Sequence, residues 1–360
     1  WKQHNLAQAL NRIGGIDHPA DPALADQRGI GYRNRGLIPL RREDTGRLRM
    51  GYFRRGTHRI VNLSQCPVLD PRLNGLVAPL KADLDASGLE ADHDLSQGQG
   101  LRHLGLRLGH HTGEVLITVV SSQPHPALPL LAQRWFHQWD HVKGVTLNLQ
   151  PRRTNQILGP NTRVLAGVDR IREQFCGLDL FLSTTTFFQI NTPQAEQIVR
   201  LIVAWLGAKS VDGPIIDAYC GIGTISLPLA AEGLQVVGIE INPDSIAQAQ
   251  ANAVANGLET LTRFRAGDVA TELQAELSGC SALVLDPPRR GLAPDVVEAI
   301  LADPPPLLAY LSCDVATQAR DLRQLLAPAG VYALERLQPV DFFPQTTHLE
   351  SLALMRRINS

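Results

Sequence analysis

The stretch "GPIIDAYCGIGTISLPLA", residues 213–230, decides the fold. Its opening run of apolar residues predicts a buried strand, a glycine loop follows, and the apolar residues after the loop predict a helix. Gly221 and Gly223 let the backbone of the loop approach a ligand more closely than residues with a Cβ atom would. A buried strand that passes through a glycine loop into a helix is typical of nucleotide-binding α/β domains.

The strand–helix alternation continues through the second half of the chain. "LQVVGIE" (234–240), "ALVLDPP" (282–288) and "LLAYLS" (307–312) are predicted strands, and a helix is expected between Asn242 and Gly257. This order predicts a doubly wound, mostly parallel sheet, that is, a Rossmann-like α/β domain. We assign residues 185–360 to it.

Residues 1–184 have a different rhythm and form the second predicted domain. We expect a short helix over residues 1–14, strands between residues 30 and 65, and a loop at 83–100. A hairpin is expected around "HHT" at 110–112, because apolar, β-branched runs flank it. The region is therefore predicted to be β-rich.

The charge distribution separates the two halves. Residues 1–180 contain 23 Lys and Arg against 16 Asp and Glu, whereas residues 181–360 contain 11 against 19. Ten arginines lie between Arg28 and Arg59, interleaved with aromatic residues, which is how proteins contact phosphates and stack on bases. Nucleic-acid binding is favoured over an ordinary solvated basic face, with Arg33, Arg35, Arg54 and Arg55 as candidate contacts.

Composition limits the setting of the protein. Five scattered cysteines argue against a disulfide framework and favour a reducing cytoplasm. Apolar runs stay well short of the ~20 residues that span a bilayer, so no membrane partner is expected. We expect a monomer. Because the chain starts at Trp1 rather than Met, an upstream segment is expected to be missing.

The residues around the glycine loop favour S-adenosylmethionine as the bound nucleotide. Glu240 ends the next predicted strand, where an acidic residue can bind both ribose hydroxyls. The loop lacks the third glycine of the dinucleotide fingerprint, and Asp217 would repel a pyrophosphate but not a cationic sulfonium. Asp268 follows the expected third strand; it is either a contact for the adenine amino group or a turn residue.

Three further residues lie where doubly wound folds carry their chemistry. Asp286 and Cys313 follow predicted strands, and the helix expected after Cys313 could stabilise a thiolate through its dipole. Taken alone, Cys313 is more often a buried structural thiol than a catalytic one. Glu350 precedes the last predicted strand, and Arg289 follows Asp286 where amine methyltransferases usually carry an aromatic residue.

The joint set of motifs resembles the RNA (uracil-5-)-methyltransferases. "FFQIN", "DAYCGIGT", "GIEIN", "LDPPRRGL", "LSCDVATQARDL" and "THLES" occur in that family's order, and "YFRRGTHRIVNLSQCP" resembles its RNA-binding half. The resemblance implies that Cys313 is the nucleophile, that Glu350 is the general base and that Arg289 belongs to the RNA-binding residues. It implies S-adenosylmethionine contacts at Gln189, Tyr219, Gly221, Thr224, Glu240, Gly267, Asp268 and Asp286.

The implied reaction explains the pairing of a thiol with an acid. Uracil C5 is too weak a nucleophile to attack a methyl sulfonium until a thiolate has added to C6. A base must then remove the C5 proton before the thiolate can leave. The target uridine must also leave its stack.

Cys66 resembles the last of four ligands to a [4Fe–4S] cluster in one branch of this family. The other three would lie upstream of Trp1, so the native protein is expected to carry a cluster that this chain does not. That branch favours 23S rRNA as the substrate, and the tRNA T-loop is the alternative. A dinucleotide oxidoreductase and a non-catalytic RNA-binding or RNA-folding protein are the alternatives from other classes.

Overall fold

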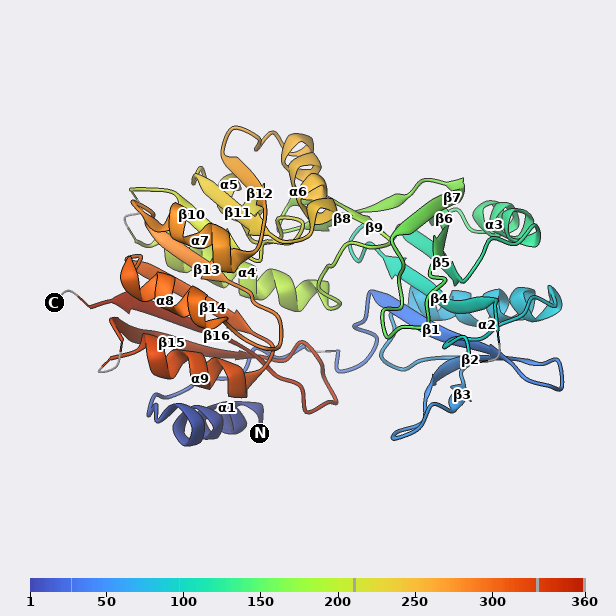
Figure 1. The fold of residues 1–360 in the computed structure, drawn as a ribbon, viewed down its shortest axis with the longest axis horizontal. Helices are drawn as coiled ribbons and strands as arrows, with labels where there is room; N and C mark the ends of the chain where they lie inside the picture. Colours follow the sequence, from blue (N-terminus) through green and yellow to red (C-terminus); the bar gives the residue numbers. More distant parts are fainter. Residues whose placement is uncertain (27, 97, 210–211, 328–329, 359–360) are drawn as a thin grey trace. The chain divides into compact units, whose positions relative to one another are not determined.

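The computed structural model describes residues 1–26, 28–96, 98–209, 212–327 and 330–358 (Figure 1). The chain forms two compact units. Unit 1 comprises Trp1–Gly29, Phe175–Asp179 and the residues from Phe187 onward, and unit 2 comprises Ile30–Gln174 and Leu180–Thr186. None of the described helices is both long and apolar enough to cross a bilayer.

Unit 1 contains a seven-stranded sheet in the order β12-β11-β10-β13-β14-β16-β15. The pairings from β12 to β14 are parallel, whereas β16 pairs antiparallel with both β14 and β15. The predicted doubly wound α/β fold is therefore confirmed. The strands are β10 (Ile215–Ala218), β11 (Val236–Glu240), β12 (Thr262–Ala266), β13 (Ala282–Leu285), β14 (Leu307–Ser312), β15 (Tyr332–Val340) and β16 (Glu350–Arg357).

Helices cover both faces of this sheet (Figure 1). Residues of α7, α8 and α9 form one core with β10, β13, β14 and β16, while α4, α5 and α6 lie on the other face. Apolar strands buried on both faces are what a parallel sheet requires. The helices are α4 (Thr192–Gly207), α5 (Ser226–Ala231), α6 (Pro243–Ala255), α7 (Val269–Leu277), α8 (Pro294–Ala302) and α9 (Val315–Leu325).

The N-terminal segment packs onto the core of unit 1. Helix α1 (Lys2–Ala9) continues into the π-helical turn η1 (Leu10–Gly14), which ends at Gly15 with a φ of 67°. Leu6 and Leu10 are four residues apart and are both buried in this core. The sequence analysis assigned Trp1–Gly29 to the β-rich domain, whereas in the structure this segment belongs to unit 1. The reason is that Leu6 and Leu10 are buried in the core of unit 1, where their helical segment contacts α9.

Unit 2 is built on a second seven-stranded sheet in the order β3-β2-β1-β4-β5-β6-β7. Two helices cover one face and bury Leu76, Leu80 and Trp135 in its core. The elements are β1 (Arg35–Arg42), β2 (Leu48–Phe53), β3 (Ile60–Asn62), α2 (Pro71–Ala86), β4 (Leu101–Leu108), β5 (Val115–Ser121), α3 (Ala127–Gln138), β6 (Val142–Leu149) and β7 (Asn161–Gly167), followed by the hairpin of β8 (Arg170–Phe175) and β9 (Leu178–Ser183).

Helices α2 and α3 were not predicted, and residues 83–86, predicted as loop, form the last turn of α2. The sequence nevertheless contains the residues that start α2. The carboxylate of Asp70 accepts a hydrogen bond from Arg72 N at 3.0 Å, and Pro71 occupies the first turn. Pro79 inside the helix hides the pattern, because proline normally ends a helix.

Candidate active site

The glycine loop after β10 leaves an open backbone cradle. Tyr219 N and Cys220 N both donate to Ile239 O, at 2.8 and 3.0 Å, which fixes the start of the loop beside β11. Tyr219, Gly221 and Gly223 all have positive φ values. A Cβ on Gly221 would have no atom within 4 Å, so the backbone there faces open space. This is the geometry in which a ligand can approach the main chain.

Glu240 is held at the end of β11 by two backbone amides. Its Oε2 accepts from Gly221 N at 3.3 Å and its Oε1 accepts from Asn242 N at 2.8 Å. Asp268 follows β12, as predicted, and caps helix α7 by accepting from Ala270 N at 3.0 Å. Its negative charge helps to raise the pKa of Tyr219 to about 12, after the larger effect of burial. Glu240, Asp268 and Tyr219 thus surround the same loop.

Asp217 carries a buried oxygen atom without a partner. Its Oδ2 accepts from Ser226 Oγ at 2.5 Å, but Oδ1 has no hydrogen bond in the part of the chain that the structure describes. Burial and then the charge of Glu240 raise the pKa of this carboxyl to about 7. A buried acceptor of this kind fits a cationic ligand group and would repel a pyrophosphate.

Cys313 and Glu350 face each other across a strand pair. Ser312 at the end of β14 pairs with Ser351 in β16, so the next positions outward in this antiparallel register are Cys313 and Glu350. Asp286 follows the neighbouring strand β13, and its N–H donates to Ala218 O at 3.4 Å, just before the glycine loop. The structure therefore brings the thiol and both carboxyl groups to the edge of the sheet that carries the cradle.

Burial and a neighbouring carboxyl group raise the pKa values of both Glu350 and Asp286. Burial and then the charge of Asp286 raise the pKa of Glu350 to about 8, and Arg289 opposes the increase. Burial and then Asp217 raise the pKa of Asp286 to about 7. Perturbed carboxyl groups that cluster at the end of strands are typical of catalytic sites.

The expected thiolate stabilisation by helix α9 is wrong for the protein without ligands. The pKa of Cys313 lies above its ordinary value, because burial and the charges of Glu350 and Asp286 outweigh Arg289. The first amides of the helix are also already used. The carboxylate of Asp314 accepts from Ala316 N and Thr317 N, each at 3.0 Å. These surroundings therefore favour the neutral thiol of Cys313 over its thiolate.

The sequence analysis missed two buried polar residues of α9. They connect this helix to β14, to β16 and to the loop after Asp286. Gln318 donates to Tyr310 O at 3.0 Å and to Ser351 O at 3.1 Å, and so ties β14 to β16. Asp321 accepts from Tyr310 Oη at 2.7 Å and from Leu292 N at 2.9 Å, and so ties in the loop after Asp286. Both lie on the helix face that buries Leu322 and Leu325, which is the sequence signal that could have revealed them.

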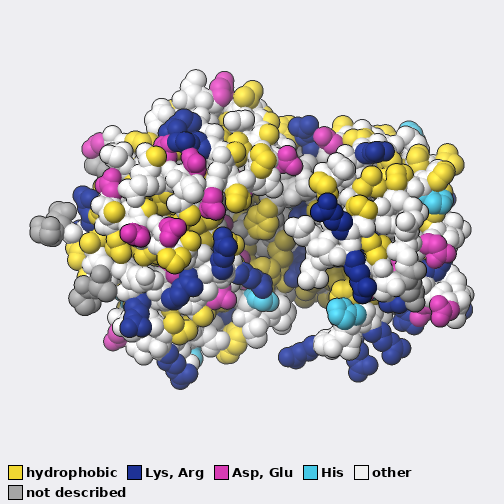
Figure 2. Space-filling view, in the orientation of Figure 1, with side chains coloured by type: hydrophobic (Ala, Val, Ile, Leu, Met, Phe, Trp, Pro, Cys, Tyr) yellow, Lys and Arg dark blue, Asp and Glu magenta, His cyan; other side chains and the backbone are white. Residues whose placement is uncertain are grey.

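The other predicted residues occupy varied positions. Gln189 and Thr224 are half-buried in unit 1, and Arg289 is exposed there. In unit 2, Arg54 and Arg55 are exposed in the turn after β2, within a group of Lys and Arg side chains that Figure 2 shows over the β2–β3 region. The remaining two, Arg33 and Arg35, are only partly exposed.

The described residues do not fit an iron–sulfur cluster. Cys66 is buried in the apolar core of unit 2, and none of the five free cysteines belongs to a described group of three or more potential ligands. One thiolate cannot hold a [4Fe–4S] cluster.

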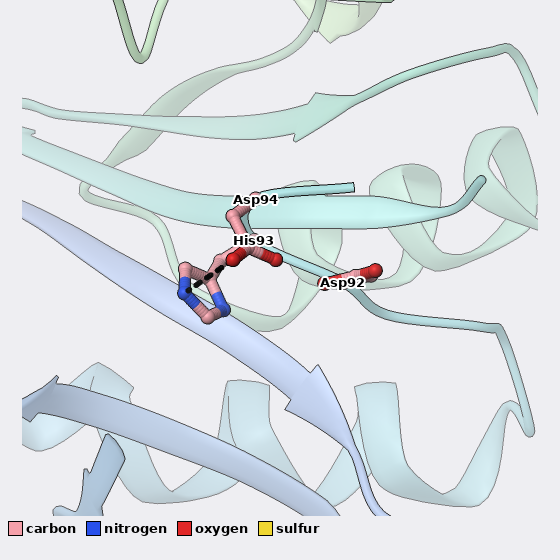
Figure 3. Close-up of side chains that lie close together, drawn as sticks. All are labelled: Asp92, His93 and Asp94. Atoms are coloured by element: carbon pink, nitrogen blue, oxygen red, sulfur yellow. Dashed lines mark ion pairs between the residues drawn. The ribbon is translucent and has the colours of Figure 1, made fainter. Parts of the chain in front are cut away.

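Asp92, His93 and Asp94 form a potential metal-binding group, with ligand atoms within 4.8 Å of one another (Figure 3). Arg102 is attracted by both carboxylates and donates to His93 O at 3.0 Å, and Arg41 adds a second positive charge near His93. Because these arginines already offset the two carboxylates, we assign no metal here.

The fold and the cradle define a class I S-adenosylmethionine-dependent methyltransferase. Comparisons with known proteins identify a family within this class. The family described as tRNA (Uracil-5-)-methyltransferase matches residues 180–358. An uncharacterized RNA methyltransferase of Parasynechococcus marenigrum is 74% identical over 360 residues, covering 100% of this chain and 77% of that protein. Another, from Nostoc, is 43% identical, covering 98% of this chain and 77% of that protein.

A solved structure agrees over almost the whole chain. The Pyrococcus abyssi tRNA (uracil-54, C5)-methyltransferase in complex with S-adenosyl-L-homocysteine is 25% identical, with a TM-score of 0.81 over 98% of this chain and 82% of that one. The chain belongs to the RNA (uracil-5-)-methyltransferase family, as the motifs predicted. A dinucleotide oxidoreductase is thereby excluded.

Proposed function

We propose that this RNA uracil-5-methyltransferase acts through a covalent bond between Cys313 Sγ and uracil C6, on a uridine of 23S rRNA. The facing positions of Cys313 and Glu350 at the cofactor edge carry the proposal. The predicted contacts of the cofactor support it, because Asp217 and the Gly221 backbone leave room and an unpartnered acceptor for a cationic ligand. S-adenosylmethionine, when bound, supplies an electrophilic methyl group.

The proposed steps assign one task to each residue. The half-buried Cys313 thiol gives its proton to solvent, and the thiolate adds to C6, which makes C5 nucleophilic. After C5 has gained the methyl group, Glu350 accepts the C5 proton, and the C6–S bond breaks to restore the uracil double bond. With a pKa raised to about 8, the ionised form of Glu350 is a stronger base than an exposed carboxylate, so the step requires Glu350 to be ionised and should speed up as pH rises toward 8.

The basic residues supply the proposed RNA interface. Arg33, Arg35, Arg54, Arg55 and Arg289 are the predicted contacts. Phe53 is 42% exposed next to Arg54, and its ring lies 5.9 Å from that of His58, which offers a surface for stacking on a base. The iron–sulfur cluster enters no step, and a monomeric, cytoplasmic protein remains our prediction.

Two RNA molecules are candidates for the substrate. The predicted 23S substrate depends on the resemblance around Cys66. The Pyrococcus abyssi protein is named for a tRNA uridine, which makes tRNA the second candidate. Mapping 5-methyluridine in both RNA fractions from a strain that lacks the gene decides between them. Loss of the modification from tRNA alone would contradict the rRNA proposal.

The covalent mechanism is tested with two substitutions and a control. We expect Cys313→Ala to abolish tritium release from C5-labelled uridine in RNA while S-adenosylmethionine binding persists. We expect Glu350→Gln to accumulate a covalent protein–RNA adduct, because the C5 proton is no longer removed. Cys176→Ala removes another half-buried thiol of unit 1 and should leave turnover unchanged. An active Cys313→Ala protein would sink the mechanism.

A further inference from the structure

Two arginines are paired on the face of the unit 2 sheet opposite α2 and α3. In the antiparallel register of β1 and β4, Arg35 lies opposite Arg107. The alternate residues Ile38, Leu104 and Leu106 point into the core with α2 and α3, so the two arginines occupy the other face. Directly opposed residues have Cβ atoms about 5 Å apart, which places two like charges next to each other.

Neither guanidinium group has a negatively charged partner in the described residues. Arg35 Nη2 donates to Thr184 O at 3.1 Å and Arg107 Nη2 donates to Thr186 O at 2.5 Å, and both acceptors are neutral. Arg107 is only 5% exposed, and its Nε is buried without a hydrogen bond. Burial lowers the pKa of Arg35 to about 10, and burial and then Arg35 lower that of Arg107. Burying the cation of Arg107 beside the partly exposed cation of Arg35, without a counter-ion, is unfavourable.

A narrow hollow lies beside this pair. Arg35, Arg107, Thr118 and Thr184 line it together with Leu37, Gly105 and Leu106. Its volume of about 10 Å³ is close to what one water-sized atom needs. The hydroxyls of Thr118, Thr146 and Thr184 lie 2.9 to 3.1 Å from one another and hydrogen-bond among themselves. The unpartnered buried donor at the hollow is therefore Arg107 Nε, and the described lining contains no carboxylate. It therefore fits a single anionic oxygen.

We propose that the Arg35–Arg107 pair binds a phosphate oxygen of the RNA backbone. Arginine presents a planar set of donors that matches phosphate oxygens, and an RNA phosphate would supply the missing negative charge. This inference rests on the proposed function and deepens it, because it separates one built anion site from the exposed arginines of the β2–β3 turn. Arg107 was not among the predicted RNA contacts.

The salt dependence of RNA binding tests the pair. Fluorescence anisotropy with a labelled single-stranded oligouridylate gives the dissociation constant across a NaCl series. Arg35→Gln and Arg107→Gln should each weaken binding at low salt and reduce the slope of log K against log salt by about 0.7, the value for one phosphate contact on a single strand. Arg163→Gln is the matched control. This substitution removes the same charge from the same sheet, but Arg163 is exposed on β7 and lies outside the pair. Slopes equal to the control would overturn the site.

A second measurement covers variants that fold poorly. The urea midpoint of each protein is measured with inorganic phosphate or with chloride at matched ionic strength. Phosphate should raise the midpoint of the wild type and of Arg163→Gln, because a ligand of the folded state stabilises it. The effect should be lost in Arg35→Gln and Arg107→Gln, which lack one of the two positive charges. If the arginines only hold the carbonyl groups of residues 184 and 186, both variants would lose stability equally in both buffers, and the proposal would fail.

The two proposals fail separately. A wild-type protein that forms no 5-methyluridine contradicts the proposed function, whereas the phosphate midpoints decide the anion site without any RNA. A phosphate effect without any change in the RNA salt slope would show an anion site that RNA does not use, and would contradict the inference as stated.

Discussion

The position of Glu350 affects two pKa values, that of its own carboxyl group and that of the Cys313 thiol. Its buried position raises its own pKa to about 8, and its charge, once present, raises the pKa of the thiol opposite. In the proposed reaction, the carboxylate needed as the base in the last step therefore opposes formation of the thiolate needed in the first step. Arg289 is the positive charge that lowers both values, so its predicted RNA contact would also change the reactivity of the site.

The first prediction concerns the thiol itself. In Glu350→Gln the carboxylate that raises the pKa of Cys313 is gone, so this pKa should fall. The pH profile for alkylation of Cys313 by iodoacetamide, measured by mass spectrometry of its peptide, should shift to lower pH by about half a unit to one unit. Cys176 is the internal control, because its pKa is raised to about 11 by burial and Glu196. Identical Cys313 profiles in both proteins would contradict the coupling.

Helix α9 joins the parts of the site at the scale of elements. Asp314 caps its first turn, Gln318 connects the strands of Cys313 and Glu350, and Asp321 fixes the loop after Asp286. Gly291 in that loop has a φ of 73°, and a Cβ there would lie 2.6 Å from Asp321 Oδ2. The loop can therefore lie against the helix only with glycine at this position.

The second prediction tests Gln318 as a positioning residue. Gln318→Met keeps the size of the side chain but leaves two strand carbonyl groups without a donor, which costs about 1–3 kcal/mol of unfolding free energy. We expect kcat to fall about tenfold or more, with little change in KM for S-adenosylmethionine, because the cradle lies on other strands. Gln324→Met, exposed on the same helix, should change neither value. A loss of stability without a change in kcat would make Gln318 merely structural.

The elements show which parts of the fold are visible in the sequence. The parallel strands of unit 1 were predictable because each is an apolar run followed by a polar residue at the edge of the sheet, as in Asp286 and Cys313. Helix α2 was not, since Pro79 lies inside it. The hydrogen bonds of Gln318 and Asp321 could not be predicted, because their partners lie 8 to 33 residues away and a local sequence pattern does not show them.

At the scale of the whole molecule, the chain order is interleaved. The N-terminal 29 residues belong to the same compact unit as the C-terminal half, and residues 30–174 lie in the other unit. The sequence analysis drew one boundary at residue 184, because charge and periodicity change there. Those signals describe the local composition of a segment. The N-terminal segment belongs to unit 1 because Leu6 of α1 and Leu10 of η1 pack among residues that are distant in the sequence, which local composition does not show.

The third prediction follows from that core. Leu10 is 1% exposed among residues of unit 1, so Leu10→Ala should cost about 2–5 kcal/mol through lost burial and a remaining cavity. Urea unfolding should show the loss, and S-adenosylhomocysteine should recover part of it by binding the folded state. Leu130→Ala is the control, since Leu130 is 76% exposed on α3. Equal stability of the two variants would mean that α1 does not belong to the core.

Strand β16 follows β15 in the sequence but lies inside the sheet, between β14 and β15. During synthesis, therefore, the thiol of Cys313 leaves the ribosome well before the strand that completes its surroundings. Until then β14 has an unpaired edge, which is a surface for aggregation rather than for catalysis. The same insertion brings Glu350 into the sheet, so Cys313 gains its ordered surroundings only when the residue that we propose as the base is also in place.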